Sequence, residues 1–332
     1  MRFVLYPDAW EKQDDRFHLD GLLLKVADTW HLLDATDHDE LIKSPWYEAL
    51  STTKQELICN ALVQASYKRE TRSGPHLRSY DVSRESSSAL TPEQARRLAE
   101  TPLCLVVENR FSDANGFAKH IIEVLAPEHA DLVNHPTQPL VFDGGGGITE
   151  IPKVIRNHQT RADRLKIPAR VVIFMDSDAR FPKDSGQGVT QSKSVEKECK
   201  MLGVPTHRLK KRSIENYLPD SVLENWAGKS RDRKRWVKAV IALSSDRRDH
   251  YPLKSGLRSL FKRDYQLKSI DEVHFYCNLS TEDKKTLWQG ERKALPEAFA
   301  KRAYWAKVSA KDLRDRAGNE FNKLVTLILD EL

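Results

Sequence analysis

Acidic side chains follow two short apolar runs of this chain, at the point where each run ends. Residues 103–107 are apolar and precede Glu108, and residues 171–175 are apolar and precede Asp176 and Asp178. Short runs rich in valine and isoleucine, separated by helix-like sequence, are typical of buried parallel strands. Functional groups collect at the carboxyl ends of such strands, and carboxylate oxygens suit Mg²⁺ or Mn²⁺. The sequence therefore predicts a divalent-metal site at Glu108, Asp176 and Asp178.

The spacing of the two aspartates favours one shared cation. Asp176 and Asp178 are two positions apart, so they project from one face while the strand stays extended. Glu108 occupies the equivalent position on the first strand, and neighbouring strands lie about 5 Å apart. A cation with ligand bonds of about 2.1 Å can span that gap. The alternative is that the Asp-Ser-Asp segment only caps the turn that follows it.

Two other acidic positions lie where a strand leads into a helix. Asp113 stands at the expected start of the helix after Glu108, where it is either a metal ligand or an N-terminal cap. Asp143 precedes Gly144–Gly147, and such glycines allow close backbone approach and direct N–H groups towards an anion. No Gly-Lys-Ser/Thr follows, so this is not a nucleotide-phosphate loop of the P-loop type.

Basic residues surround a further acid near the middle of the chain. Lys210, Lys211 and Arg212 come directly before the segment that contains Glu215 and Tyr217. This order fits phosphate contacts beside a second metal ligand. The alternative is a surface helix start in which Glu215 is solvated.

The net charge of +6 is unevenly distributed along the chain. Residues 1–199 carry 25 basic and 30 acidic side chains, whereas residues 200–332 carry 29 basic and 18 acidic ones. The second part is suited to a polyanion, and its densest basic cluster is expected to contact a phosphate backbone. This cluster consists of Arg231, Arg233, Lys234 and Arg235. The alternative is a solvated helix face.

The pattern of apolar runs predicts three regions in an α/β protein with a mainly parallel sheet flanked by helices. Residues 1–101 are expected to be mainly helical, residues 102–218 to form the α/β catalytic domain, and residues 219–332 to be a basic helical region. In the first region we expect a strand at 2–6, helices at 19–33, 39–50 and 53–67, a loop or irregular hairpin at 69–90, and a helix started by Thr91-Pro92. In the second we expect strands at 103–108, 139–142, 170–175 and 205–209, and helices at 113–125, 149–164 and 189–202. The last helix is expected at 310–329.

Composition restricts the class of protein. No apolar run is long enough to cross a membrane, and the first residues do not resemble a signal peptide. The four cysteines have no paired spacing, and the eleven histidines show no ligand spacing, so no zinc site or redox dithiol is expected. Free thiols and a cytoplasmic location are the expectation.

Four motifs in order resemble a TOPRIM domain. They are Val106-Val107-Glu108 with Asp113, the glycine-rich turn, Met175-Asp176-Ser177-Asp178, and Ser213-Ile214-Glu215-Asn216-Tyr217-Leu218. More narrowly, residues 102–220 are similar to the branch found in OLD-family (overcoming lysogenisation defect) nucleases and related bacterial defence proteins. Topoisomerase and primase versions often carry a third aspartate where this chain has Arg180, which favours the nuclease branch.

The resemblance implies specific residue roles. Metal ligands would be Glu108, Asp113, Asp176, Asp178 and Glu215. A later lysine often meets charge on the phosphate in such nucleases, and Lys254 is the candidate, with a solvated lysine as the alternative.

The function that the resemblance implies is a Mg²⁺- or Mn²⁺-dependent endonuclease that cleaves nucleic acid, DNA in preference to RNA, as an effector of anti-phage defence. OLD proteins carry an ATPase in the same chain, and this chain has none, so we expect a separate ATPase or regulatory partner that docks on the first hundred residues. A homo-oligomer is left open. Two alternatives remain: an RNA-processing TOPRIM nuclease, and a non-catalytic binding or sensor module.

Overall fold

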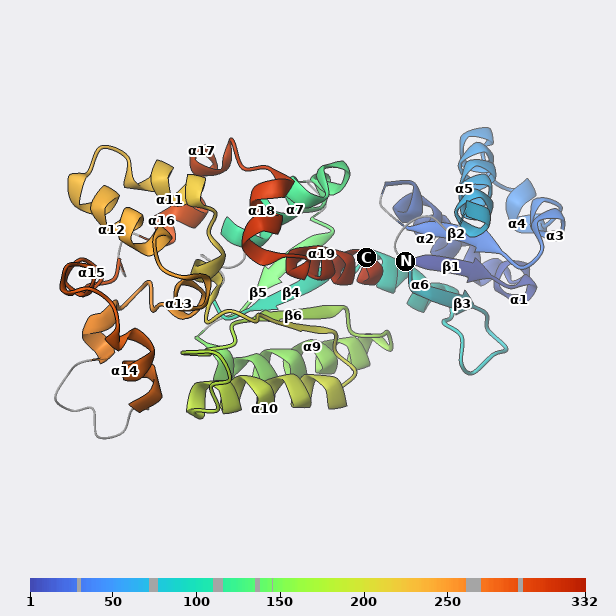
Figure 1. The fold of residues 1–332 in the computed structure, drawn as a ribbon. Coiled ribbons are helices and arrows are strands. Elements are labelled where there is room, and N and C mark those ends of the chain that lie inside the picture. Colours follow the sequence, from blue (N-terminus) through green and yellow to red (C-terminus); the bar gives the residue numbers. More distant parts are fainter. Residues whose placement is uncertain are drawn as a thin grey trace.

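Two parallel sheets form the β-structure of this protein (Figure 1). The computed structural model describes residues 1–28, 31–71, 77–109, 116–134, 138–144, 146–260, 270–291 and 295–332. One sheet has three strands in the order β2-β1-β3, and the other has four in the order β5-β4-β6-β7. All strand pairs among the described residues are parallel. The expected α/β class is therefore confirmed.

The first hundred residues combine helices with the three-stranded sheet. Strand β1 (Arg2–Leu5) pairs with β2 (Leu32–Ala35) on one side and with β3 (Ser79–Val82) on the other. The helices are α1 (Pro7–Glu11), η1 (Gln13–Asp15), α2 (Arg16–Asp28), α3 (His38–Ile42), α4 (Pro45–Glu48), α5 (Thr52–Thr71) and α6 (Pro92–Glu100). Helix α6 begins with a full capping box between Thr91 and Gln94, as the Thr-Pro start predicts.

Two of the three strands in this sheet were not predicted. The expectation of one helix over 19–33 is wrong at its end, because Leu32 and Leu33 belong to β2. Asp28, Thr29 and His31 separate the apolar residues of α2 from those of β2, but this stretch holds no glycine or proline that would mark the end of the helix. The stretch 69–90 contains β3, whose Ser-Tyr-Asp-Val sequence is polar because only its last residue is buried. The helix expected at 39–50 is two short helices, since Ser44 and Pro45 start a new one.

The four strands of the second sheet lie close to the positions predicted from the sequence. They are β4 (Leu103–Val107), β5 (Leu140–Asp143), β6 (Val171–Met175) and β7 (Thr206–Arg208). The two central strands, β4 and β6, are buried at every residue. Burial on both faces explains why these two strands are continuous apolar runs rather than alternating ones.

Helices cover both faces of this sheet, as Figure 1 shows. Helices α9 (Ile151–Leu165) and α10 (Gln187–Met201) lie on the face to which Cys104 and Val106 point. Helices α7 (Lys119–Leu125) and α19 (Glu320–Glu331) lie on the face of Leu105 and Val107. Helix α9 is preceded by the short helix η4 (Ile148–Glu150).

The last third of the chain is helical, as predicted. Its elements are η5 (Ile214–Tyr217), α11 (Asp220–Ala227), α12 (Arg231–Ile241), α13 (Ser245–His250), η6 (Leu257–Leu260), α14 (Ile270–Cys277), α15 (Thr281–Thr286), α16 (Pro296–Ala300), α17 (Arg302–Trp305), α18 (Ala310–Ala317) and α19. The single helix expected at 310–329 is two helices, because Gly318 adopts a φ of 58° and ends α18. Among the described residues, no helix is long and apolar enough to cross a membrane.

Arg170 holds the chain end against the amino end of β6. Its guanidinium is buried and donates to the carbonyl oxygens of Thr101, Glu331 (3.0 Å) and Leu332 (3.2 Å). Burial lowers the pKa of Arg170 to about 10. The contact joins the start of the second sheet to the end of α19, so the opposite, carboxyl edge of the sheet remains for the acidic side chains.

Candidate metal centre at the carboxyl edge of the second sheet

The acidic residues lie at the point where the strand order changes direction. Central strand β4 is followed in sequence by β5 on one side and by β6 on the other. Ligands of open parallel sheets bind at such a switch point, outside the carboxyl ends of the strands. Val107 pairs with Phe174, so Glu108 after β4 and Asp176 after β6 emerge at the same edge.

Hydrogen bonds join Glu108 and Asp176 to each other and to the segment that carries Glu215. The Asp176 backbone N–H donates to Glu108 Oε1 at 2.8 Å. The Ile214 backbone N–H donates to Asp176 Oδ1 at 2.9 Å. The end of β4, the end of β6 and the start of η5 are therefore held together through carboxylate oxygens. Asp176 thus caps η5, whereas α10, the next helix after the aspartate pair, begins only at Gln187.

Asp178 is held in an uncommon backbone conformation. Its φ is +56°, in the left-handed region, and its N–H donates to the Arg212 carbonyl at 2.9 Å. A Cβ on Gly188 of α10 would lie 3.0 Å from the Asp178 Cβ, so the glycine permits this close approach. Burial raises the pKa of Asp178, against the opposing charges of Arg212 and Lys254. Left-handed non-glycine residues cluster at functional sites, where the surroundings hold them in place.

Ser177, between the two aspartates, anchors the segment. It is 1% exposed, its Oγ donates to the Lys211 carbonyl, and its carbonyl accepts from Ser192 Oγ at 3.0 Å. Sequence reasoning gave Ser177 no role. Its hydrogen bonds orient the acidic side chains on either side of it.

Glu215 is a buried carboxylate with spare acceptor capacity. It is 1% exposed, which excludes the solvated alternative. Lys254 Nζ lies 2.6 Å from Glu215 Oε1, yet neither Glu215 oxygen accepts a well-oriented hydrogen bond from any residue that the structure describes. A buried charge is costly unless it is paired or binds a metal. The ion pair also brings Lys254 into the site, where its side chain is 46% exposed.

The neighbours of Glu215 in its motif position η5. Ser213 and Asn216 form a capping box, and Asn216 Nδ2 donates to the carbonyls of Arg248 (2.8 Å) and Tyr251 (2.9 Å). The Tyr217 hydroxyl donates to Glu320 Oε2 at 2.6 Å. Ser213, Asn216 and Tyr217 are thus occupied by structural contacts, and Glu215 is the member of the motif whose carboxyl group pairs with Lys254.

The three basic residues ahead of Glu215 differ in their exposure. Lys211 is 8% exposed, and its Nζ binds Asp249 Oδ1 (2.9 Å) and the Arg316 carbonyl. Burial lowers the pKa of Lys211 to about 8. Arg212 binds Glu272 Oε1 at 2.9 Å, whereas Lys210 is exposed. The expectation of a direct phosphate contact is therefore wrong for Lys211, because its ammonium is already bound inside the protein.

The second basic cluster lies on α12. Arg231, Lys234 and Arg235 are exposed there, and the Arg235 guanidinium pairs with Glu282. The Arg233 guanidinium stacks 4.7 Å from the centre of the Trp226 ring. The position of the cluster on an exposed helix face is compatible with both interpretations of the sequence.

The structure describes only some of the remaining residues of the predicted site. Asp113 lies outside the described residues, and so does Gly145 of the glycine turn. Gly144 has a φ of +146°, and a Cβ there would lie 2.0 Å from the Val107 carbonyl oxygen. Only glycine therefore fits beside the end of β4.

Among the described residues, the predicted carboxylate ligands do not form a closed cage of ligand atoms. In the part of the chain that the structure describes, three ligand atoms come within 4.8 Å of one another only at Cys104, Asp143 and His158, and none of these is a predicted metal ligand. Mg²⁺ usually keeps several water ligands and binds through one or two carboxylates. An all-carboxylate donor set with a buried, under-satisfied Glu215 suits that mode of binding.

Comparison with models of protein families, with curated proteins and with solved structures finds no match to this chain. The residues of the site are therefore the basis on which its chemistry is assigned.

Proposed function

We propose that this chain is a divalent-metal-dependent nuclease of the TOPRIM type, related to the OLD-like defence branch. The observation that carries the proposal is the buried Glu215 carboxylate, which pairs with Lys254 and, in addition to burial, helps to raise the pKa of Asp178 at the switch point of a parallel sheet. Glu108 and Asp176 lie at the same edge and are connected by a hydrogen bond. A cluster of carboxylates is suited to bind a divalent cation, and the partly exposed ammonium of Lys254 beside it is suited to contact a phosphate.

Each residue has a separate task in this proposal. Glu108, Asp176, Asp178 and Glu215 would hold Mg²⁺ or Mn²⁺, and Asp113 is added by the resemblance. When bound, the ion would supply an activated water and positive charge beside the reacting phosphate. Lys254, half exposed and oriented by Glu215, would donate to a phosphate oxygen as its charge increases.

Metal choice and substrate together test this function. Purified protein is incubated with plasmid, linear duplex, single-stranded DNA, transfer RNA or ribosomal RNA, in Mg²⁺, Mn²⁺ or Zn²⁺. Because the donors are carboxylates, we expect cleavage with Mg²⁺ or Mn²⁺ and none with Zn²⁺. Cleavage of RNA alone would favour an RNA-processing enzyme. No cleavage of any substrate, with specific binding retained, would favour a non-catalytic module.

The basic face of α12 is proposed to contact the phosphate backbone. Arg231→Glu with Lys234→Glu should weaken DNA binding and lower the slope of log K against log salt by about two, since each lost phosphate contact removes about one unit. The measurement is fluorescence anisotropy at several salt concentrations. Lys12→Glu with Lys43→Glu is the control, because both lysines are exposed residues of the first hundred and the charge change is equal. An unchanged slope in the α12 variant would leave the cluster as a solvated face.

We further propose a separate ATPase or regulatory partner that restrains or recruits the nuclease during phage infection and docks on the first hundred residues. The support is indirect: the sequence has no nucleotide-phosphate loop, and the proposed catalytic residues all lie beyond residue 101. Expression of the chain alone is compared with expression beside its genomic neighbours. We expect a neighbouring product to bind the chain and alter its toxicity. Absence of both effects would contradict the partner.

A further inference from the structure

Three potential metal ligands of different chemistry converge on the α9 side of the second sheet. Cys104 lies on β4, Asp143 ends β5, and His158 lies on α9. We propose that Cys104, Asp143 and His158 form a Zn²⁺ site, separate from the carboxylates at the switch point. The proposal does not rest on the nuclease function.

The distances fit a tetrahedral centre. Cys104 Sγ lies 3.5 Å from His158 Nε2, and His158 Nε2 lies 2.9 Å from Asp143 Oδ2. All three ligand atoms are within 4.8 Å of one another. Zinc binds sulfur at about 2.3 Å and nitrogen at about 2.05 Å, so a tetrahedral centre separates those two atoms by about 3.5 Å. The nitrogen–oxygen separation needs to widen by only about 0.4 Å.

The arrangement differs from that of a nucleophilic triad. In a triad, the acid binds one ring nitrogen of the histidine while the nucleophile binds the other. Here Cys104 and Asp143 both approach Nε2 of His158. A neutral imidazole nitrogen serves as donor or acceptor, not both. Two acidic groups directed at one nitrogen are better explained by a cation that all three share.

The donor set selects zinc over the hard ions expected at the switch point. A thiolate, an imidazole and a carboxylate are all established zinc ligands, whereas Mg²⁺ prefers oxygen alone. Cys104 is 2% exposed and His158 is 25% exposed at its side chain, so the site is shielded but reachable.

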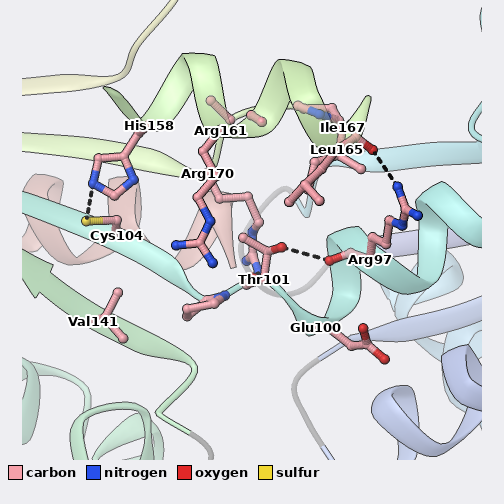
Figure 2. A pocket seen from close by; sticks show the side chains of 14 residues that line it. Arg97, Glu100, Thr101, Cys104, Val141, His158, Arg161, Leu165, Ile167 and Arg170 are labelled. Atoms are coloured by element: carbon pink, nitrogen blue, oxygen red, sulfur yellow. Dashed lines mark hydrogen bonds between the residues drawn. The ribbon is translucent and has the colours of Figure 1, made fainter. Parts of the chain in front are cut away.

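A cavity supplies room for a fourth ligand. Cys104 and His158 point towards each other at one end of a pocket of about 320 Å³ (Figure 2). Zinc sites with three protein ligands keep an open fourth position, usually filled by water. Arg97, Arg161 and Arg170 also line this pocket and give it positive charge.

The test uses the thiolate as its reporter. In a Cys59→Ser/Cys277→Ser background, which removes the two exposed cysteines, cobalt is added as a spectroscopic substitute for zinc. We expect thiolate-to-cobalt charge-transfer absorption and one equivalent of zinc in competition with a chromophoric chelator. Cys104→Ser should remove the absorption, and His158→Gln should weaken zinc binding by about tenfold or more. Cys199→Ser is the matched control, because Cys199 is buried in the same core cluster.

Thermal unfolding adds a readout that needs no activity. Zinc should raise the melting temperature of the background protein and of Cys199→Ser, but not of Cys104→Ser, since only a ligand that binds the folded state stabilises it. If Cys104→Ser does not fold, Asp143→Asn replaces it, because Asp143 is 46% exposed at its side chain. No cobalt–thiolate absorption in the background protein, or full absorption in Cys104→Ser, would overturn the site and leave a hydrogen-bonded cluster.

Discussion

Asp178→Asn should abolish cleavage and make the metal-free protein more stable. The loss of activity is expected to be about 10³-fold, the scale seen when one preorganised charge contact is removed from an active site. The gain in stability follows from the raised pKa of Asp178, because burial makes its charged form unfavourable in the folded state. Asparagine also tolerates the left-handed backbone that this position requires.

The raised pKa of Asp178 also predicts the direction in which stability changes with pH. The pKa of Asp178 in the folded state lies above its unfolded value of 3.8. The wild type therefore loses stability as pH rises from about 4 through the folded pKa, and Asp178→Asn does not. The difference in unfolding free energy between Asp178→Asn and wild type should therefore increase over that pH range and stay constant at higher pH. Urea unfolding in a chelating buffer measures it, and single-turnover cleavage measures the activity.

Asp176→Asn is the companion variant for the same claim. Its Oδ1 can still accept from the Ile214 N–H, so the connection to η5 is retained while the charge is lost. We expect a similar loss of cleavage with an unchanged unfolding transition. Cleavage by either variant within about threefold of wild type, far below the loss expected for a catalytic charge, would exclude the aspartate pair from the reaction.

Lys254→Ala should lower both activity and stability, and metal should restore only the stability. Removal of the ammonium leaves the buried Glu215 carboxylate without its ion-pair partner. Breaking a buried pair costs about 3 kcal/mol or more, and less here because Lys254 is half exposed to water. A Mg²⁺ ion beside Glu215 would replace the missing positive charge, so the stability deficit should shrink as Mg²⁺ is added. Cleavage should stay about 10²-fold low, since the phosphate has lost its donor.

Lys54→Ala is the matched control for that experiment. Lys54 forms an ion pair with Asp20 at 2.5 Å in the first hundred residues, and both side chains are about one-third exposed. Its loss should cost less than about 1 kcal/mol and show no response to Mg²⁺. If Lys254→Ala behaves like this control, or if Mg²⁺ does not reduce its deficit, the lysine is a surface residue and the metal assignment at Glu215 fails.

The acidic carboxyl edge of the second sheet could be predicted because each strand and the acid that follows it are adjacent in the sequence. Strands β4 and β6 are buried on both faces, so each is a continuous apolar run, and the acid that follows each run marks its carboxyl end. The register of the strands then brings Glu108 and Asp176 together, as the spacing of the runs implies. The helix start at Thr91 was equally local, because it depends on a capping box between residues three positions apart.

What sequence reasoning missed depends on residues far apart in the chain. Lys211 is buried because Asp249 and Arg316 reach it from other elements. Strand β3 is a polar strand whose partner, β1, lies more than seventy residues earlier. The Cys104, Asp143 and His158 cluster has no paired spacing, so only the fold brings it together.

Binding of Mn²⁺, followed by the electron paramagnetic resonance signal of the free ion, tests the central claim most directly. The experiment uses a His158→Gln background, so that the second proposed site does not contribute, and compares it with the same protein carrying Glu215→Gln or Asp176→Asn. The account predicts Mn²⁺ binding in the background protein and affinity at least about tenfold weaker in both variants, as expected when a charged ligand is lost. Equal Mn²⁺ binding by all three proteins would contradict a metal centre at the carboxyl edge of this sheet.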